Sequence, residues 1–257
     1  MKTIIKLSSL AILAFALFLN SCKDEEKVDP VPTETKGTLS IDFDHVWAMS
    51  GASFSMNKML FHPMTSDSLN FTKLQYYVSN VQLKKSDGTW WICPESYYLI
   101  DLSKPASLEV SISDIPSGTY TEMSYTMGVD SLRNVSGAQT GALSTANGMF
   151  WDWNSGYIML KAEGMSPNST SKNFVFHLGG FKGVNNIVTK KNTNFGGGSL
   201  IIGAGLTPSV GIKVNPARLW HSSPSVSTVN MIQMPGAAAK QMAKDFYDAI
   251  IFDHIHP

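Results

Sequence analysis

The feature that most constrains the fold is an alternation of apolar and polar residues that recurs in short segments. Leu39, Ile41 and Phe43 alternate with polar residues, the period of two that is typical of a β-strand with one buried face. Segments rich in β-branched and aromatic residues follow at 74–78, 97–100, 108–112, 120–129, 157–162, 174–178, 200–202 and 210–214. Short strands at such intervals predict an all-β fold, an antiparallel β-sandwich of Ig-like or jelly-roll-like type.

Two segments depart from this strand pattern. Residues 237–252 place Met242, Phe246 and Ile250 at helical spacing, so we expect one short amphipathic C-terminal helix. Residues 129–154 are rich in glycine and asparagine, which predicts a long loop, and long ordered loops on sandwiches often carry function. No internal repeat or shift in composition divides residues 38–257, so a single domain is expected.

The N-terminal segment has the pattern of a secretion signal. Two lysines precede an apolar run over residues 7–19, and Cys22 follows the small residue Ser21. We interpret residues 1–21 as a signal peptide and Cys22 as the lipidation site, because the apolar run is too short to cross ~30 Å of hydrocarbon comfortably. Ordinary secretion or an uncleaved anchor is the alternative.

The segment 22–37 has almost nothing to bury, since it is polar, charged and contains prolines. It predicts a flexible tether. Lys23 followed by acidic residues resembles the export signal of Bacteroidetes surface lipoproteins. We therefore expect an outer-membrane lipoprotein, facing the periplasm or the cell surface, that contacts the membrane only through its lipid.

Charge and cysteine content narrow the classes of function. The sequence has 20 basic and 20 acidic residues and no net charge, which argues against a nucleic-acid partner. With Cys22 lipidated, Cys93 has no second cysteine for an intrachain disulfide, and we expect it to be buried and inert. The sequence contains no nucleophile elbow, phosphate-binding glycine loop, paired-cysteine zinc pattern or HExxH motif. We therefore do not expect an enzyme.

An aromatic segment at the end of the predicted loop is the strongest local signal. Residues 148–157 contain Trp151, Trp153 and Tyr157 between glycines, and three large aromatic side chains are costly to expose. They either close one end of the sandwich or have a binding function. In the second case, they form a platform for a sugar ring, or one tryptophan lies beside a metal.

Four histidines are candidate metal ligands, since imidazole is the commonest ligand and the compartment favours copper or zinc. His45 continues the inward parity of Phe43, and His177 ends the strand predicted at 174–178. His254 and His256 would share one side of an extended terminus. Spacing leaves open whether these histidines meet or are separate core and surface residues. His62 and His221 fall in predicted loops and are expected at the surface.

Several of these motifs occur together in one known family. The chain resembles the MbnP-like family, named for a copper-binding protein associated with methanobactin. The resemblance rests on the segments 74–81, 128–131, 141–143, 148–158, 163–164 and 176–180 in this order. The tryptophan-containing segment is the most specific of them.

The resemblance implies a β-sandwich that binds copper, most readily Cu(I), through histidines. It also implies a di-haem partner of the MauG-like, cytochrome c peroxidase-related type, which oxidises one tryptophan to kynurenine. Carried over by position, Trp151 or Trp153 is the modified residue, His45 and His177 are ligands, and His254 or His256 is a third. The methionines form no Met-x-x-Met cluster, so imidazoles would dominate the site.

Two other classes of function remain open from the residues themselves. A surface module could bind glycans on a platform of Trp151, Trp153 and Tyr157, because a lipid tether and exposed aromatics suit that function as well. A purely structural envelope protein would need neither a metal nor a glycan.

Overall fold

The structure, a computed structural model, describes residues 35–137, 139–152 and 154–257. The predictions for the signal peptide, for Cys22 and for Trp153 lie outside the described residues. So does most of the predicted tether, whose last residues already belong to the first strand. No helix in the described residues is long and apolar enough to span a membrane.

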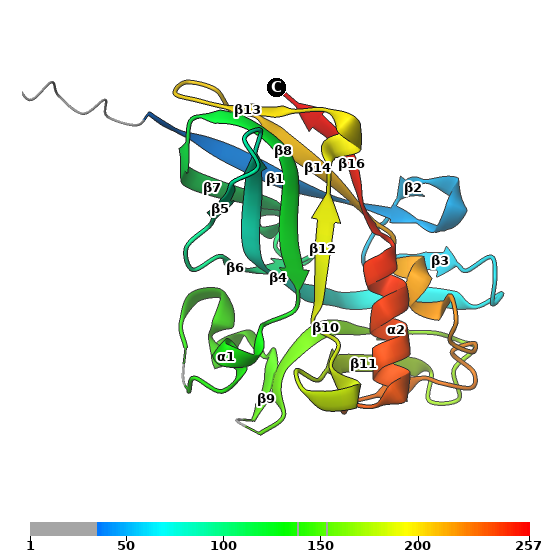
Figure 1. The fold of residues 1–257 in the computed structure, drawn as a ribbon. Helices are drawn as coiled ribbons and strands as arrows, with labels where there is room; N and C mark the ends of the chain where they lie inside the picture. The colour runs from blue at the N-terminus through cyan, green and yellow to red at the C-terminus, as the bar shows by residue number, and fades with distance from the viewer. Residues whose placement is uncertain (1–34, 138, 153) are drawn as a thin grey trace, which may run out of the picture. The chain divides into compact units, whose positions relative to one another are not determined.

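The smaller of two sheets is built around the first strand (Figure 1). Its path runs β16-β14-β1-β2, and β7 pairs with the other side of β1. Leu39, Ile41 and Phe43 of β1 are buried, as their alternation predicts. The strands are β1 (Lys36–Trp47), β2 (Ala52–Ser53), β7 (Glu109–Pro116), β14 (Ser209–Val214) and β16 (Ile250–His256).

The larger sheet follows the path β12-β8-β4-β10-β11-β15. Its longest strand, β4, pairs with β3, β5, β6, β8 and β10 and so joins several short segments into one sheet. The strands are β3 (Met59–Phe61), β4 (Ser68–Lys85), β5 (Trp90–Ile92), β6 (Tyr97–Asp101), β8 (Gly118–Met127), β9 (Phe150–Asp152), β10 (Gly156–Met165), β11 (Asn173–Gly179), β12 (Thr189–Thr193), β13 (Leu200–Ile202) and β15 (Met231–Ile232).

The predicted all-β sandwich is confirmed, with one refinement in strand direction. β1 pairs with β14 in parallel, and β11 pairs with β15 in parallel, so both sheets are mixed and not purely antiparallel. Alternation along a strand specifies its buried face but not the direction of its neighbour, because the same side chains are buried in either case.

The C-terminal helix exists but is shorter than predicted. α2 (Ala237–Asp248) buries Met242 and Phe246, and it lies against β11 and beside β12 (Figure 1). Residues 250–252, which the helical spacing included, instead begin β16, where Ile250 pairs with Val214. The prediction was wrong there because pairing with an exposed sheet edge competes with one further helical turn.

The predicted loop between β8 and β10 contains short ordered elements: α1 (Ser131–Asn134), β9 and two 3-10 turns. The two turns span Gly141–Leu143 and Thr145–Asn147. Further 3-10 turns join other strands and span Ala48–Ser50, Pro105–Leu108, Gly183–Asn185, Phe195–Gly197 and Pro216–Trp220.

The core between the sheets is aromatic. Trp220 packs edge-on against Phe71, Phe174 and Phe176. His62 also belongs to this cluster, since its ring is only 2% exposed and contacts Trp220. The expectation that His62 is a surface residue was therefore wrong. Its ring nitrogens are bonded to the Ala217 carbonyl and to Thr65, which compensates the cost of burial. His221 is exposed, as expected.

Candidate functional site

His45 lies on the buried face of β1, as predicted, but the strand and its buried face continue to Trp47. Its Nε2 lies 3.1 Å from the Tyr76 hydroxyl, and the ring also bonds to the backbone of Phe43. Burial lowers the pKa of His45 to about 4, because a charged ring is costly away from water. The imidazole is therefore neutral at pH 7 and accepts a hydrogen bond from Tyr76.

A cavity adjoins His45 at the end of β1. Its volume is about 390 Å³, and His45 and Met56 are among the residues that line it. A soft sulfur and a neutral nitrogen are donors that suit Cu(I). Tyr76 occupies Nε2 in this arrangement, so the tyrosine hydroxyl would have to turn away before a metal reached that atom.

His177 lies in β11 on the other face of the larger sheet. Its backbone pairs with Lys161, which pairs in turn with Gln75 of β4. Gln75 and Tyr76 are consecutive and point to opposite faces, and Tyr76 is the residue that contacts His45. His45 and His177 are therefore on opposite faces of the sheet.

Glu163 of β10 orients the His177 ring. Its Oε1 lies 2.8 Å from His177 Nε2. An ionised carboxylate only accepts hydrogen bonds, so Nε2 carries the proton and donates it, which leaves a lone pair on Nδ1. A carboxylate that fixes the tautomer in this way is the usual partner of a metal-binding histidine.

Trp151 of β9 lies over Gly179, which is two positions along β11 from His177. Its six-membered ring packs against Gly179, where an added Cβ would lie 2.9 Å from Cη2 and nearer still to Cζ3. Gly179 and His177 have the same strand parity, and their Cα atoms are about 7 Å apart. The indole therefore lies on the same face of the sheet as the His177 imidazole. Trp151 is half-buried by this contact.

The segment 141–151 covers this outer face and is attached to two further strands. The Tyr77 hydroxyl of β4 donates to the Ala142 carbonyl at 3.0 Å. From β10, the Lys161 ammonium donates to the Gly148 carbonyl. Burial beneath the loop lowers the pKa of Lys161. These two contacts, with Trp151 on Gly179, fix the aromatic segment above the sheet.

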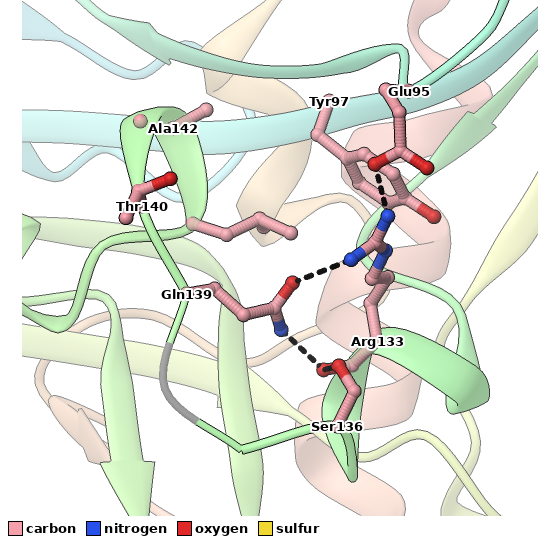
Figure 2. Close-up of a pocket in the computed structure, with 9 residues that line it drawn as sticks. Glu95, Tyr97, Arg133, Ser136, Gln139, Thr140 and Ala142 are labelled. Carbon is pink, nitrogen blue, oxygen red and sulfur yellow. Dashed lines mark hydrogen bonds and ion pairs between the residues drawn. The ribbon is translucent and has the colours of Figure 1, made fainter.

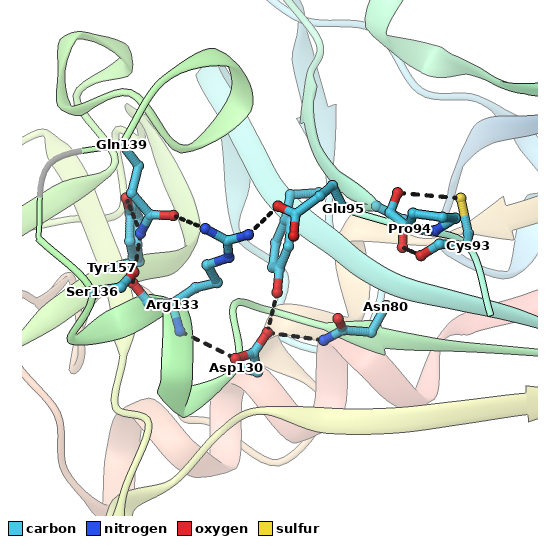
Figure 3. Close-up of polar contacts among 11 residues, drawn as sticks. Asn80, Cys93, Pro94, Glu95, Asp130, Arg133, Ser136, Gln139 and Tyr157 are labelled. Atoms are coloured by element: carbon cyan, nitrogen blue, oxygen red, sulfur yellow. Dashed lines mark hydrogen bonds and ion pairs between the residues drawn. The ribbon is translucent and has the colours of Figure 1, made fainter. Parts of the chain in front are cut away.

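The start of the loop is held by a polar network around Asp130. Its Oδ2 accepts hydrogen bonds from the Tyr97 hydroxyl at 2.5 Å and from Asn80 at 3.1 Å, and its Oδ1 accepts one from the Arg133 amide (Figure 3). These bonds to the ionised carboxylate lower the pKa of Asp130 against the opposing effect of burial.

Arg133 extends the network to the opposite wall of a polar cavity of about 480 Å³ (Figure 2). The guanidinium forms an ion pair with Glu95 and contacts Gln139. Because Glu95 neutralises the charge of Arg133, this pair gives the cavity no net positive charge that would attract an anion. We assign the network to the positioning of the loop.

His254 and His256 are brought together, as predicted for an extended terminus. Both are exposed on β16, and their ring centroids are 4.5 Å apart. His254 pairs with Gly211 of β14, whose neighbours Val210 and Ile212 are buried. The two rings are therefore on the outer face of the smaller sheet.

The four candidate histidines thus occupy three places and do not form one shared site. His45 is in the core, His177 is on the outer face of the larger sheet, and the remaining pair is on the outer face of the smaller sheet. Among the residues that the structure describes, no group of three or more His, Cys, Asp or Glu side chains is arranged to hold a metal ion.

Tyr157 does not contribute to an exposed aromatic platform. Its ring is 1% exposed, and its hydroxyl donates to the Leu143 carbonyl at 2.6 Å. The glycan hypothesis therefore loses one of its three rings. Of the other two, Trp151 is half-buried and Trp153 lies outside the described residues.

Sequence reasoning missed Glu163, Lys161 and Gly179 as parts of this site. Glu163 and Lys161 have the strand parity that would have placed them on one face, but the residues opposite them are set by pairing with β4 and β11. Gly179 carried a signal, since a glycine in a strand often marks a close approach of another group.

The fold and the loop-covered face define an all-β sandwich protein with an aromatic segment fixed over one sheet. The chain belongs to the MbnP family, whose model matches residues 36–237. The solved structure of MbnP from Methylosinus trichosporium is similar, with a TM-score of 0.51 and 14% sequence identity over 79% of this chain and 83% of that chain. No curated protein matches the chain significantly.

Proposed function

We propose that this protein binds copper on the outer face of the larger sheet, between His177 and the part of the aromatic segment that carries Trp151, and that it is a binding protein and not an enzyme. Membership of the MbnP family supports the choice of metal. The observation that carries the choice of site is the 2.8 Å contact between Glu163 and the His177 ring, beside the indole of Trp151.

The geometry fits a metal at His177 in one specific respect. The proton on Nε2 is directed to Glu163, so Nδ1 is the atom that would bind copper. An imidazole held by a carboxylate is a stronger and better-oriented donor than a free one. His45, in contrast, has both ring nitrogens engaged within the core.

One imidazole is not a complete copper site, so the aromatic segment must supply further donors. The family resemblance implies conversion of a tryptophan to kynurenine, which adds an aryl amine and a ketone. We propose Trp151 or Trp153 as the modified residue and a di-haem protein of MauG-like type as the partner that oxidises it. Cu(I), which accepts few ligands and prefers nitrogen and sulfur, is the proposed oxidation state.

The proposed location follows from the N-terminal sequence. A signal peptide and lipidation at Cys22 would place the domain outside the cytoplasm on a flexible tether. Such a position exposes the domain to environmental copper and to a partner in the same compartment.

The first test is to isolate the protein from its native host. A tryptophan that gains about 4 Da by losing a carbon and gaining an oxygen, together with bound copper, is expected. Peptide mapping of residues 148–157 identifies which residue is changed. Unmodified tryptophans without copper would contradict the proposal. Copper on an unmodified protein would retain the metal site and eliminate the maturation.

The second test assigns the ligand. Competition with a chromophoric Cu(I) chelator is measured for the native protein, His177→Ala and His45→Gln. We expect the Cu(I) affinity to fall roughly tenfold or more in His177→Ala and to change little in His45→Gln. The reverse result would move the site to the cavity beside Met56. Equal affinity in all three proteins would eliminate both sites.

A further inference from the structure

The C-terminal strand carries two histidines whose rings are in edge-to-face contact. His254 and His256 are two residues apart on β16, so they extend from the same face. Their ring centroids lie 4.5 Å apart with an interplanar angle of 83°. Ile255 between them turns inward and packs against the core. The strand backbone therefore holds both imidazoles on the solvent side.

The neighbouring strand leaves space for this pair. His254 lies beside Gly211 and His256 beside Ser209. The His254 ring leans over the glycine, where an added Cβ would lie 2.9 Å from Nδ1 and 3.1 Å from Nε2. A larger residue at position 211 would displace the ring, so Gly211 permits its present position.

A carboxylate fixes the orientation of one ring. Asp253 accepts a hydrogen bond from His254 Nδ1 at 2.8 Å and a second from Lys213 Nζ at 2.7 Å. Because an ionised carboxylate cannot donate, the proton of His254 is on Nδ1 and its Nε2 has a lone pair. The arrangement repeats, in a separate place and on the other nitrogen, the carboxylate–imidazole contact seen at His177.

We propose that His254 and His256 chelate a divalent transition-metal ion, with Cu²⁺ preferred over Ni²⁺ and Zn²⁺. Two imidazole nitrogens suit these borderline ions, and their intrinsic order of affinity places Cu²⁺ first. Within the described residues no third His, Cys, Asp or Glu completes a cluster, so water fills the remaining positions. The site is therefore open and exchangeable.

This site is distinct from the proposed copper site at His177. It lies on the other sheet, and residues 254–256 are beyond the family-matched segment 36–237. It needs no modified tryptophan and no partner protein. The existence of this site therefore does not depend on the proposed function.

Titration of the mature protein with Cu²⁺, followed by calorimetry and electron paramagnetic resonance, tests the proposal. A one-to-one site with nitrogen hyperfine structure is expected. His254→Ala and His256→Ala should each lower its affinity by roughly tenfold or more. Asp253→Asn, which removes the charge that fixes the tautomer, should lower it by roughly tenfold. His221→Ala, at an exposed histidine elsewhere, is the control and should retain the site. His177→Ala, which removes the proposed copper ligand on the larger sheet, should remove only any second equivalent of copper and leave the signal of this site in place.

The substituted residues are exposed, and circular dichroism establishes that each variant is folded. Unchanged Cu²⁺ binding in both histidine variants would overturn the proposal. Loss of the signal in His177→Ala, with binding retained in His254→Ala, would equally overturn it and would assign the divalent ion to the larger sheet.

Discussion

Trp151 packs against the α-carbon of Gly179, and no other residue type at position 179 would permit this contact. An added Cβ would lie 2.8 Å from the Tyr157 carbonyl oxygen and 2.9 Å from the indole Cη2, whereas carbon atoms pack at about 3.5–4.0 Å. The missing side chain lets the loop that carries the tryptophan settle on the sheet beside His177.

Gly179→Ala should displace the indole and destabilise the fold by about 1–3 kcal/mol, the usual cost of overpacking. Denaturant unfolding and tryptophan fluorescence measure the two effects. Gly203→Ala is the control, because an added Cβ there finds its nearest neighbour at 3.6 Å. Equal stability of the two variants would contradict the proposed contact.

His45 should make the stability depend on pH. Its pKa is about 4 in the folded chain, against the ordinary value of 6.5. Between these values the unfolded chain binds a proton that the native chain does not, so the free energy of unfolding falls as the pH falls from 6.5 to 4. The contribution that is present above pH 6.5 and lost across this window is at most about 3 kcal/mol.

His45→Gln isolates that effect, because glutamine offers Tyr76 an acceptor but does not titrate. Urea unfolding at about pH 7 and about pH 4.5 should show a smaller loss of stability for the variant than for the native protein. His62, whose pKa burial also lowers, is present in both proteins and cancels in the comparison. An identical loss in the two proteins would show that His45 is not buried as a neutral ring.

Tyr76→Phe should destabilise the core by about 1–3 kcal/mol, because it leaves His45 Nε2 buried without its hydrogen-bond partner. Tyr247→Phe is the matched control, because the Tyr247 hydroxyl is buried but has no hydrogen-bond partner among the described residues. The unfolding midpoint and its denaturant slope measure both variants. If both variants lose the same free energy of unfolding, the hydrogen bond from Tyr76 to His45 does not contribute to stability.

Arg133→Gln should loosen the start of the long loop, because it breaks the ion pair with Glu95. We expect thermolysin to cleave within residues 131–147 severalfold faster under native conditions, since local opening controls such cleavage. Lys84→Gln, which breaks a comparable ion pair with Glu122 away from the loop, should leave the rate unchanged. Unchanged cleavage in Arg133→Gln would contradict the positioning role.

The buried face of β1 could be predicted from the sequence because alternation is a local property. Leu39, Phe43 and His45 are all buried, as their shared parity requires. Burial of Cys93 was likewise predicted and is confirmed. The short polar strand β12 was missed, because residues 189–193 pair with β8 without a buried apolar face of their own.

The boundary between α2 and β16 could not be predicted from the local sequence pattern. Ile250 fits a helical stripe as well as it fits a strand, and pairing with Val214 decides between them. The prediction that His62 lies at the surface failed for a similar reason. Nothing adjacent to it in sequence indicates that Trp47 and Trp220 enclose its ring.

The sequence by itself determined the all-β class, the family motifs, and the parity that puts His254 beside His256. Each of these depends on residues within a few positions of one another. Only the tertiary structure decided that His45 and His177 lie on opposite faces of a sheet and that Glu163 orients the latter. Those relationships depend on which strands pair and in what register, and pairing between distant segments is settled by burial of the whole core.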